Sequence, residues 1–81
     1  MDEAGEHDDQ AEEFLRALGG RIRQFRKARK LSQEKLAFAA DLTQHYLSQI
    51  EKGERNVSVI TIRALAKALG VAIAELFQGI E

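Results

Sequence analysis

A pair of short, N-capped helical segments joined by a turn, within residues 32–52, constrains this chain more than any other feature. Ser32 and Thr43 are residue types favoured as helix N-caps, and a leucine follows each of them four residues later, at helical spacing. Another leucine stands before each cap, which gives both segments the pattern of a hydrophobic staple. The staple pairs are Leu31 with Leu36 and Leu42 with Leu47. Two short helices joined by so short a turn cross steeply, and the second projects its first turn outward.

The remaining apolar spacing predicts a compact all-α domain of five helices. Ser58 suits the N-cap of a helix that Gly70 ends, and Asp41 suits a left-handed turn between the second and third helices. Gly19 and Gly20 interrupt the first helix at a cost of about 1 kcal/mol each, so a start at Gly20 is the alternative. The expected helices cover residues 10–29, 33–40, 44–52, 59–69 and 72–78.

Composition argues against several classes of function. The chain has no cysteine, so we expect no disulfide framework and no thiolate metal site. His7 and His45 lie far apart in the sequence without companion ligands, so we expect no metal. We also expect no other cofactor, and no small-molecule ligand because 81 residues leave no room for a ligand-sensing domain. No catalytic triad, glycine-rich phosphate loop or pair of inward carboxylates is present, so an enzyme is not expected. No apolar run spans a bilayer and the acidic N-terminus does not match a secretory signal, so we expect a cytoplasmic protein without a membrane partner.

The net charge of −1 hides a separation of the two signs along the chain. Residues 1–13 carry seven acidic side chains and no Lys or Arg, whereas residues 14–81 carry all twelve basic side chains and six acidic ones, a net charge of +6. We therefore expect residues 1–9 to form a disordered acidic tail before a folded domain at 10–81. The isoelectric point of 6.1 for the whole chain argues against a nucleic-acid partner. The positive charge of the folded part alone favours such a partner.

The outward face of the helix expected at 44–52 is the candidate for reading DNA. Its side chains are polar and of short or medium length, and most of them both donate and accept hydrogen bonds. They are Gln44, His45, Ser48 and Gln49. A glutamine amide can bind adenine through two hydrogen bonds in the major groove, which is wide enough for a helix. The alternative is a merely solvated surface, but the capped two-helix unit and the nearby positive charge favour DNA.

Residues 18–78 resemble the lambda-repressor-like (Cro/C1, XRE-type) helix-turn-helix family. The resemblance rests on SQEKLA at 32–37, SQIEKGERN at 48–56, LAKALGV at 65–71 and ELF at 75–77. Within that family the chain is most similar to small regulators such as the controller proteins of restriction-modification systems. The resemblance implies a transcription regulator, such as a repressor, that binds double-stranded DNA as a homodimer.

The resemblance also implies roles for individual residues. The positions that read bases are Gln44, His45, Ser48 and Gln49, and the positions close to the DNA backbone are Ser32, Gln33, Thr43, Tyr46, Arg55 and Asn56. The N–H groups at the start of the helix at Gln33 independently suit a phosphate. Tyr46 has a second interpretation as a packing residue. Arg26 and Glu51 match a structural ion pair between the first and third helices, and the alternative is that both are solvated charges.

Three positions depart from the family pattern: Asp41 stands where Gly is common, Val57 where Pro is common, and Ala72 where a polar cap is usual. Ala72 therefore predicts a weakly capped last helix that frays. A run of cations at the end of the first helix is expected only to raise the local positive potential, without contacts of its own. It includes Arg21, Arg23 and Lys27.

The sequence therefore predicts a homodimeric regulator that places the helix at 44–52 of each subunit in a major groove, with half-sites about one helical turn apart. The candidate dimer contacts are Ile73, Phe77 and Ile80. Burial within the monomer is the alternative for these residues, above all for Phe77. The competing hypothesis for the whole chain is an antitoxin or another protein-interaction module of the same fold, in which the acidic tail binds a basic partner.

Overall fold

The computed structural model describes residues 9–80, which form five α-helices and, within that range, no strand. The helices are α1 (Asp9–Ala28), α2 (Gln33–Ala39), α3 (Gln44–Glu51), α4 (Val59–Leu69) and α5 (Ile73–Phe77). The all-α class is confirmed, the alternative start of the first helix at Gly20 is wrong, and α5 is one residue shorter at each end than expected. Most of the predicted tail falls on residues 1–8, outside the described residues, whereas Asp9 begins α1. Within residues 9–80, no helix is long and apolar enough to cross a membrane.

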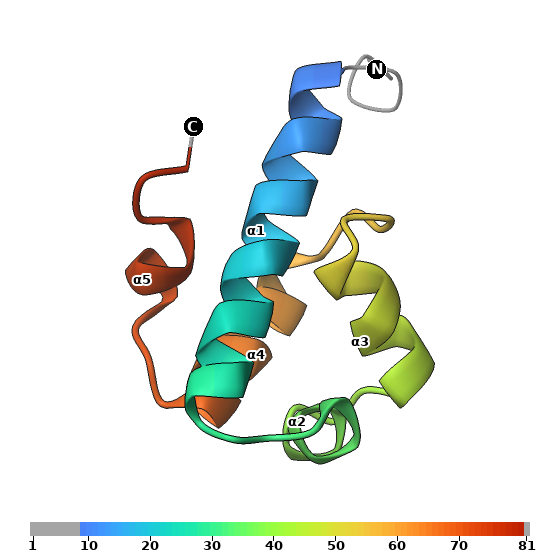
Figure 1. Ribbon diagram of the computed structural model, residues 1–81, viewed down its shortest axis with the longest axis vertical. Helices are drawn as coiled ribbons and strands as arrows, with labels where there is room; N and C mark the ends of the chain where they lie inside the picture. The colour runs from blue at the N-terminus through green and yellow to red at the C-terminus, as the bar shows by residue number, and fades with distance from the viewer. Residues whose placement is uncertain (1–8, 81) are drawn as a thin grey trace.

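The long helix α1 runs through the middle of the molecule, with α3 on one side and α5 on the other (Figure 1). α1 and α3 meet closely at Gly19, where a Cβ atom would overlap the carbonyl oxygen of Ile50 and lie 2.7 Å from that of Glu51. The neighbouring Gly20 faces open space, so a side chain there would touch nothing. The first glycine of the pair is therefore a packing requirement, whereas the second only lowers helix propensity.

Aliphatic side chains from all five helices form one core. Its buried members are Leu18, Ile22, Leu36, Ala37, Ala40, Leu47, Ile50, Ile62, Leu65, Ala66, Leu69 and Leu76. Leu47 and Ile50, the residues of α3 expected to face inward, are 0% and 1% exposed. Ala37 of α2 is also buried, and its small side chain lets α2 and α3 cross closely. The core therefore fixes which face of α3 is left for solvent.

The turn between α2 and α3 has the geometry that the sequence predicts. Ser32 Oγ accepts a hydrogen bond from the Lys35 backbone N–H at 3.0 Å, and Thr43 Oγ1 accepts one from the Tyr46 N–H at 3.1 Å. Asp41 adopts a left-handed conformation with φ of 61°. The N–H of the next residue then donates to the Ala37 carbonyl at 2.8 Å, which closes the end of α2 as a Schellman motif.

The last helix, α5, is stabilised by two side chains rather than by its N-cap residue. Ala72 has no side-chain acceptor, but its N–H donates to Glu75 Oε2 at 2.9 Å. At the other end of α5, the Arg21 guanidinium of α1 donates to the carbonyl oxygens of Glu75 at 2.9 Å and Gln78 at 2.7 Å. The expectation that Arg21 only raises the local potential is therefore wrong, because it binds the carbonyls that the end of a helix leaves unpaired.

Candidate nucleic-acid interface

The predicted base-reading residues share the outward face of α3. Gln44 and His45 are exposed in its first turn, and Ser48 and Gln49 are half-buried in its second. In Figure 1, α3 lies at the edge of the molecule, on the side of α1 away from α5. No neighbouring helix among the described residues covers this edge, so the polar face of α3 is open to a large partner.

A buried ion pair joins α1 to the C-terminal end of α3, as the resemblance implies. Arg26 Nε donates to Glu51 Oε2 at 2.7 Å, and Arg26 Nη2 donates to Glu51 Oε1 at 3.0 Å. Arg26 Nη1 donates to the Leu31 carbonyl at 2.9 Å. The two side chains are only 10% and 3% exposed. Because the arginine fork and the carboxylate bind through two parallel hydrogen bonds, the pair restricts the orientation of α3 on α1.

Gln33, expected near the DNA backbone, connects this ion pair to the start of α2. Its Nε2 donates to Glu51 Oε1 at 3.0 Å, so one end of the amide is engaged inside the protein. The half-buried Gln33 also borders a pocket together with two exposed cations to which sequence analysis assigned no contact. The pocket is lined by Arg23, Arg26, Gln33, Ser48, Glu51 and Lys52.

Arg23 and Lys52 give this pocket an excess of positive charge over the single carboxylate of Glu51. Such a pocket suits a phosphate group, which prefers cations and amide donors. A signal for both residues exists in the sequence. Arg23 stands three residues before Arg26 and so shares its helical face, and Lys52 follows Glu51 directly.

Arg55, in the loop between α3 and α4, folds back over the outward face of α3. Its Nη1 donates to Gln49 Oε1 at 2.9 Å, and its guanidinium carbon lies 5.0 Å from the centre of the Tyr46 ring. Tyr46 is half-buried and packs against the core, so the packing interpretation of this residue applies to its ring. The Tyr46 ring is at the same time the platform on which Arg55 rests.

The other residues expected near the DNA backbone divide between two places. Ser32 and Thr43 are the exposed N-caps of α2 and α3, the two helices joined by the turn at Asp41. Asn56 is also exposed, but it borders a different pocket, between the loop after α3 and the first half of α1. That pocket is lined by Glu12, Leu15, Arg16, Lys52, Gly53, Glu54 and Asn56. The structure thus separates Asn56 from the Arg55 cluster.

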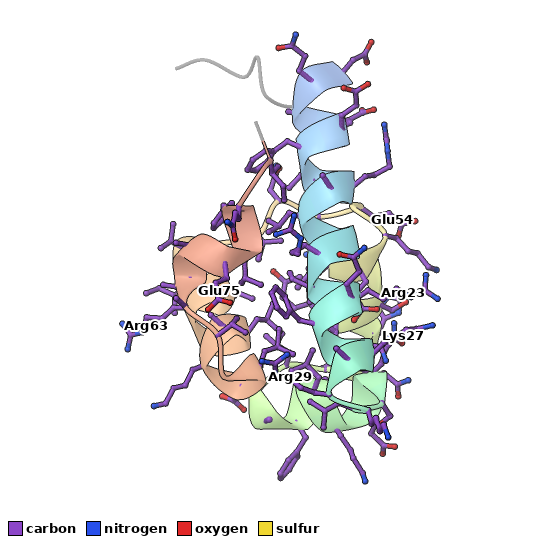
Figure 2. All side chains as sticks on the ribbon, turned by 60° about the vertical axis from the view of Figure 1, so that its left-hand side comes forward. Arg23, Lys27, Arg29, Glu54, Arg63 and Glu75 are labelled. Carbon is purple, nitrogen blue, oxygen red and sulfur yellow. The ribbon has the colours of Figure 1, made fainter. Side chains whose placement is uncertain are left out.

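The cations of α1 are distributed unevenly around the molecule. Figure 2 shows Arg23 and Lys27 projecting from α1 on the side where Glu54 of the α3–α4 loop lies. Arg63 of α4 and Glu75 of α5 lie on the opposite side in the same view. Both α1 cations are exposed. Two exposed cations of α1 therefore lie on the side of the molecule that carries the α3–α4 loop.

The three residues expected at a dimer contact lie at α5, away from α3. Phe77 is half-buried and stacks on Phe14 of α1, with ring centres 6.0 Å apart, while Ile73 is 40% exposed and Ile80 is half-buried. An apolar pocket opens beside them, lined by Phe14, Leu15, Leu18, Val57, Val59, Ile62, Ile73 and Phe77. Sequence analysis missed Val59 and Ile60, which start α4 and are 77% and 67% exposed. Two adjacent apolar residues directly after the Ser58 cap were the available signal.

The helix-turn-helix family HTH_3 matches residues 22–76, a stretch that includes all of α2, α3 and α4. The chain belongs to this family of DNA-binding transcription regulators. Its relatives include two control proteins. C.BamHI of Bacillus amyloliquefaciens is 49% identical over 62 residues, 75% of this chain and 76% of that protein. C.MunI of Mycoplasma sp is 41% identical over 65 residues, 79% of this chain and 88% of that protein.

Among solved structures, the restriction-modification controller protein C.AhdI from Aeromonas hydrophila matches with a TM-score of 0.77 and 46% sequence identity. The match covers 78% of this chain and 96% of that one. The predicted similarity to restriction-modification controller proteins is therefore confirmed.

Proposed function

We propose that this regulator binds a palindromic operator as a homodimer, with α3 of each subunit in a major groove. The observation that carries the proposal is the open polar face of α3, held in orientation by the buried Arg26–Glu51 pair. Gln44 and His45 in the first turn are the most exposed of its residues and enter the groove first. Ser48 and Gln49 follow along the groove, so that four side chains meet successive base edges.

Phosphate contacts on both sides of α3 supply most of the affinity. Arg23, Lys52 and the second N–H of Gln33 Nε2, the one not donated to Glu51, hold one phosphate at the pocket between α1 and α3. The hydroxyl groups of Ser32 and Thr43 border the same strand. Arg55, resting on Tyr46, faces the other strand, and Asn56 contacts the DNA backbone separately, from the side of the loop that borders α1.

The exposed apolar surface at α4 and α5 is the proposed dimer contact. It comprises Val59, Ile60, Ile73, Phe77 and Ile80. A second copy of the chain is the fitting occupant because a two-fold axis at this surface, away from α3, leaves both recognition helices free. The two helices then meet half-sites whose centres lie about 34–36 Å apart, one turn of B-form DNA.

The similarity to control proteins supports a place beside the genes of a restriction-modification system, in the cytoplasm where the DNA lies. A methyltransferase gene and an endonuclease gene next to the coding sequence are the expected arrangement. The operator is then expected upstream of the regulator's own gene, and footprinting on that segment tests it. Protection elsewhere in the locus, with none upstream, would contradict this assignment.

The direct test of base reading is a gel shift with DNA selected in vitro from a random pool. Replacing Gln44 and Gln49 together by Ala is expected to abolish discrimination between selected and scrambled DNA, because each glutamine amide contributes about 1–3 kcal/mol of selectivity. The far-UV circular dichroism spectrum stays unchanged, since neither side chain belongs to the core. Gln78→Ala, at the exposed C-cap of α5, is the matched control. A double variant that binds the selected DNA as selectively as the native protein excludes α3 as the reading helix.

A further inference from the structure

The amide of Gln49 has a fixed orientation, because its oxygen is held by another residue of the same surface. Gln49 Oε1 accepts a hydrogen bond from Arg55 Nη1 at 2.9 Å. The amide nitrogen therefore points away from Arg55 and keeps two N–H donors for a partner. Gln44, two turns away from the loop on the same helix, is different: within residues 9–80 its side chain makes no hydrogen bond.

Arg55 reaches Gln49 because the loop after α3 turns back on the helix. Gly53 has φ of 76°, a left-handed conformation that glycine adopts without strain. This turn lets the Gly53 N–H donate to the Ile50 carbonyl at 3.0 Å and the Glu54 N–H donate to the Gln49 carbonyl at 2.9 Å. The next residue, Arg55, then lies over the Tyr46 ring, 5.0 Å from its centre. Two backbone hydrogen bonds and one stacking contact thus hold the guanidinium beside the Gln49 amide.

We infer that Arg55 is a specificity-determining residue, which makes Gln49 read a guanine rather than an adenine. Together the two side chains present N–H donors and a positive charge, since the Gln49 oxygen is engaged and arginine has no acceptor. Guanine offers two acceptors in the major groove, N7 and O6, which match such a surface. Adenine offers one acceptor and the N6 amino donor, and that donor would face the donors of Arg55.

The inference rests on the proposed function, because it assumes that α3 enters the major groove. The inference also assigns different bases to the two glutamines. Gln44, whose amide is free to rotate, can bind adenine through both its oxygen and its nitrogen. The side-chain amide of Gln49 cannot rotate in this way while Arg55 holds its oxygen. Gln44 and Gln49, five positions apart on one helix, therefore read different bases.

Selection from a random DNA pool with four proteins tests the inference: the native chain, Arg55→Ala, Gln49→Ala, and the variant with both substitutions. The position at which Gln49→Ala loses its preference identifies the base pair that Gln49 reads. At that position the native protein is expected to prefer guanine over adenine by about tenfold. Arg55→Ala is expected to reduce this ratio to near one. Without Arg55 the Gln49 amide can rotate and can hydrogen-bond to guanine or to adenine. In the Gln49→Ala background, the further Arg55→Ala substitution is expected to leave the base preference unchanged.

Arg55→Lys and Arg63→Ala are the controls. Lysine keeps a donor and the charge, so Arg55→Lys is expected to retain part of the guanine preference. Arg63→Ala removes an exposed cation on the far side of α4 and leaves the preference as it is. Arg55 is itself exposed and outside the core, and the melting temperature of each variant verifies that it folds.

Three outcomes overturn the inference. If Arg55→Ala weakens binding to every sequence equally and leaves the guanine preference intact, Arg55 is a phosphate contact only, and the proposed function stands. If Arg55→Ala changes base preference equally with and without Gln49, Arg55 acts independently of the amide. A pool that shows no selected motif with the native protein would refute the proposed function and this inference together.

Discussion

Replacing Glu51 by alanine tests whether the buried ion pair governs the stability of this fold. The substitution removes the acceptor of three hydrogen bonds, two from Arg26 and one from Gln33. The Arg26 guanidinium then stays buried without its carboxylate, and breaking such a pair costs about 3–5 kcal/mol. A domain of this length has a free energy of unfolding of roughly 4–12 kcal/mol, so the substitution removes a large part of it.

Urea unfolding followed by far-UV circular dichroism measures this loss. Glu54→Ala, which removes an exposed carboxylate three residues later, is the matched control and is expected to change the free energy of unfolding by no more than about 0.5 kcal/mol. Substituting both partners, Arg26→Met with Glu51→Leu, removes the unpaired charge and is expected to recover at least half of the loss. The reasoning is refuted if Glu51→Ala costs less than about 1 kcal/mol, or if the double variant is less stable than Glu51→Ala.

Three further predictions follow from packing, charge and the exposed apolar surface. Gly19→Ala is expected to lower the free energy of unfolding by about 1–3 kcal/mol through overlap with α3, whereas Gly20→Ala raises it by about 0.5–1 kcal/mol; equal effects in thermal unfolding would contradict the close approach. Arg23→Ala and Lys52→Ala are each expected to make the logarithmic salt dependence of operator binding shallower by about one unit, and unchanged slopes would exclude a phosphate in their pocket. Ile60→Asp is expected to give a monomer in sedimentation equilibrium without changing the circular dichroism spectrum, and an unaltered dimer would place the contact elsewhere.

Local features of the fold were predictable because they depend on residues close in sequence. The caps at Ser32 and Thr43 and the left-handed Asp41 each follow from side-chain chemistry within one turn of a helix. The inward position of Leu47 likewise follows from helical periodicity. These features together place the outward face of α3, so the candidate reading residues could be predicted as a set.

The contacts between distant segments could not be predicted in the same way. Arg21 is an ordinary cation in the sequence, and only the position of α5 shows that it binds two carbonyls there. Gln33 was assigned to DNA alone, although part of its amide is bound to Glu51 across 18 positions. The orientation of the Gln49 amide depends on where a loop places Arg55. Each of these depends on side-chain geometry that periodicity and propensity do not describe.

The close approach at Gly19 and the ion pair at Glu51 both attach the C-terminal end of α3 to α1. Gln44 and His45 lie at the other end of the helix, outside the core and about 9–10 Å along the helix axis from Glu51. The residues that anchor α3 and the residues proposed to read DNA are therefore different residues of the same short helix. If α3 reads DNA as proposed, substitutions at Gln44 and His45 change the operator while the anchor, and with it the fold, stays the same.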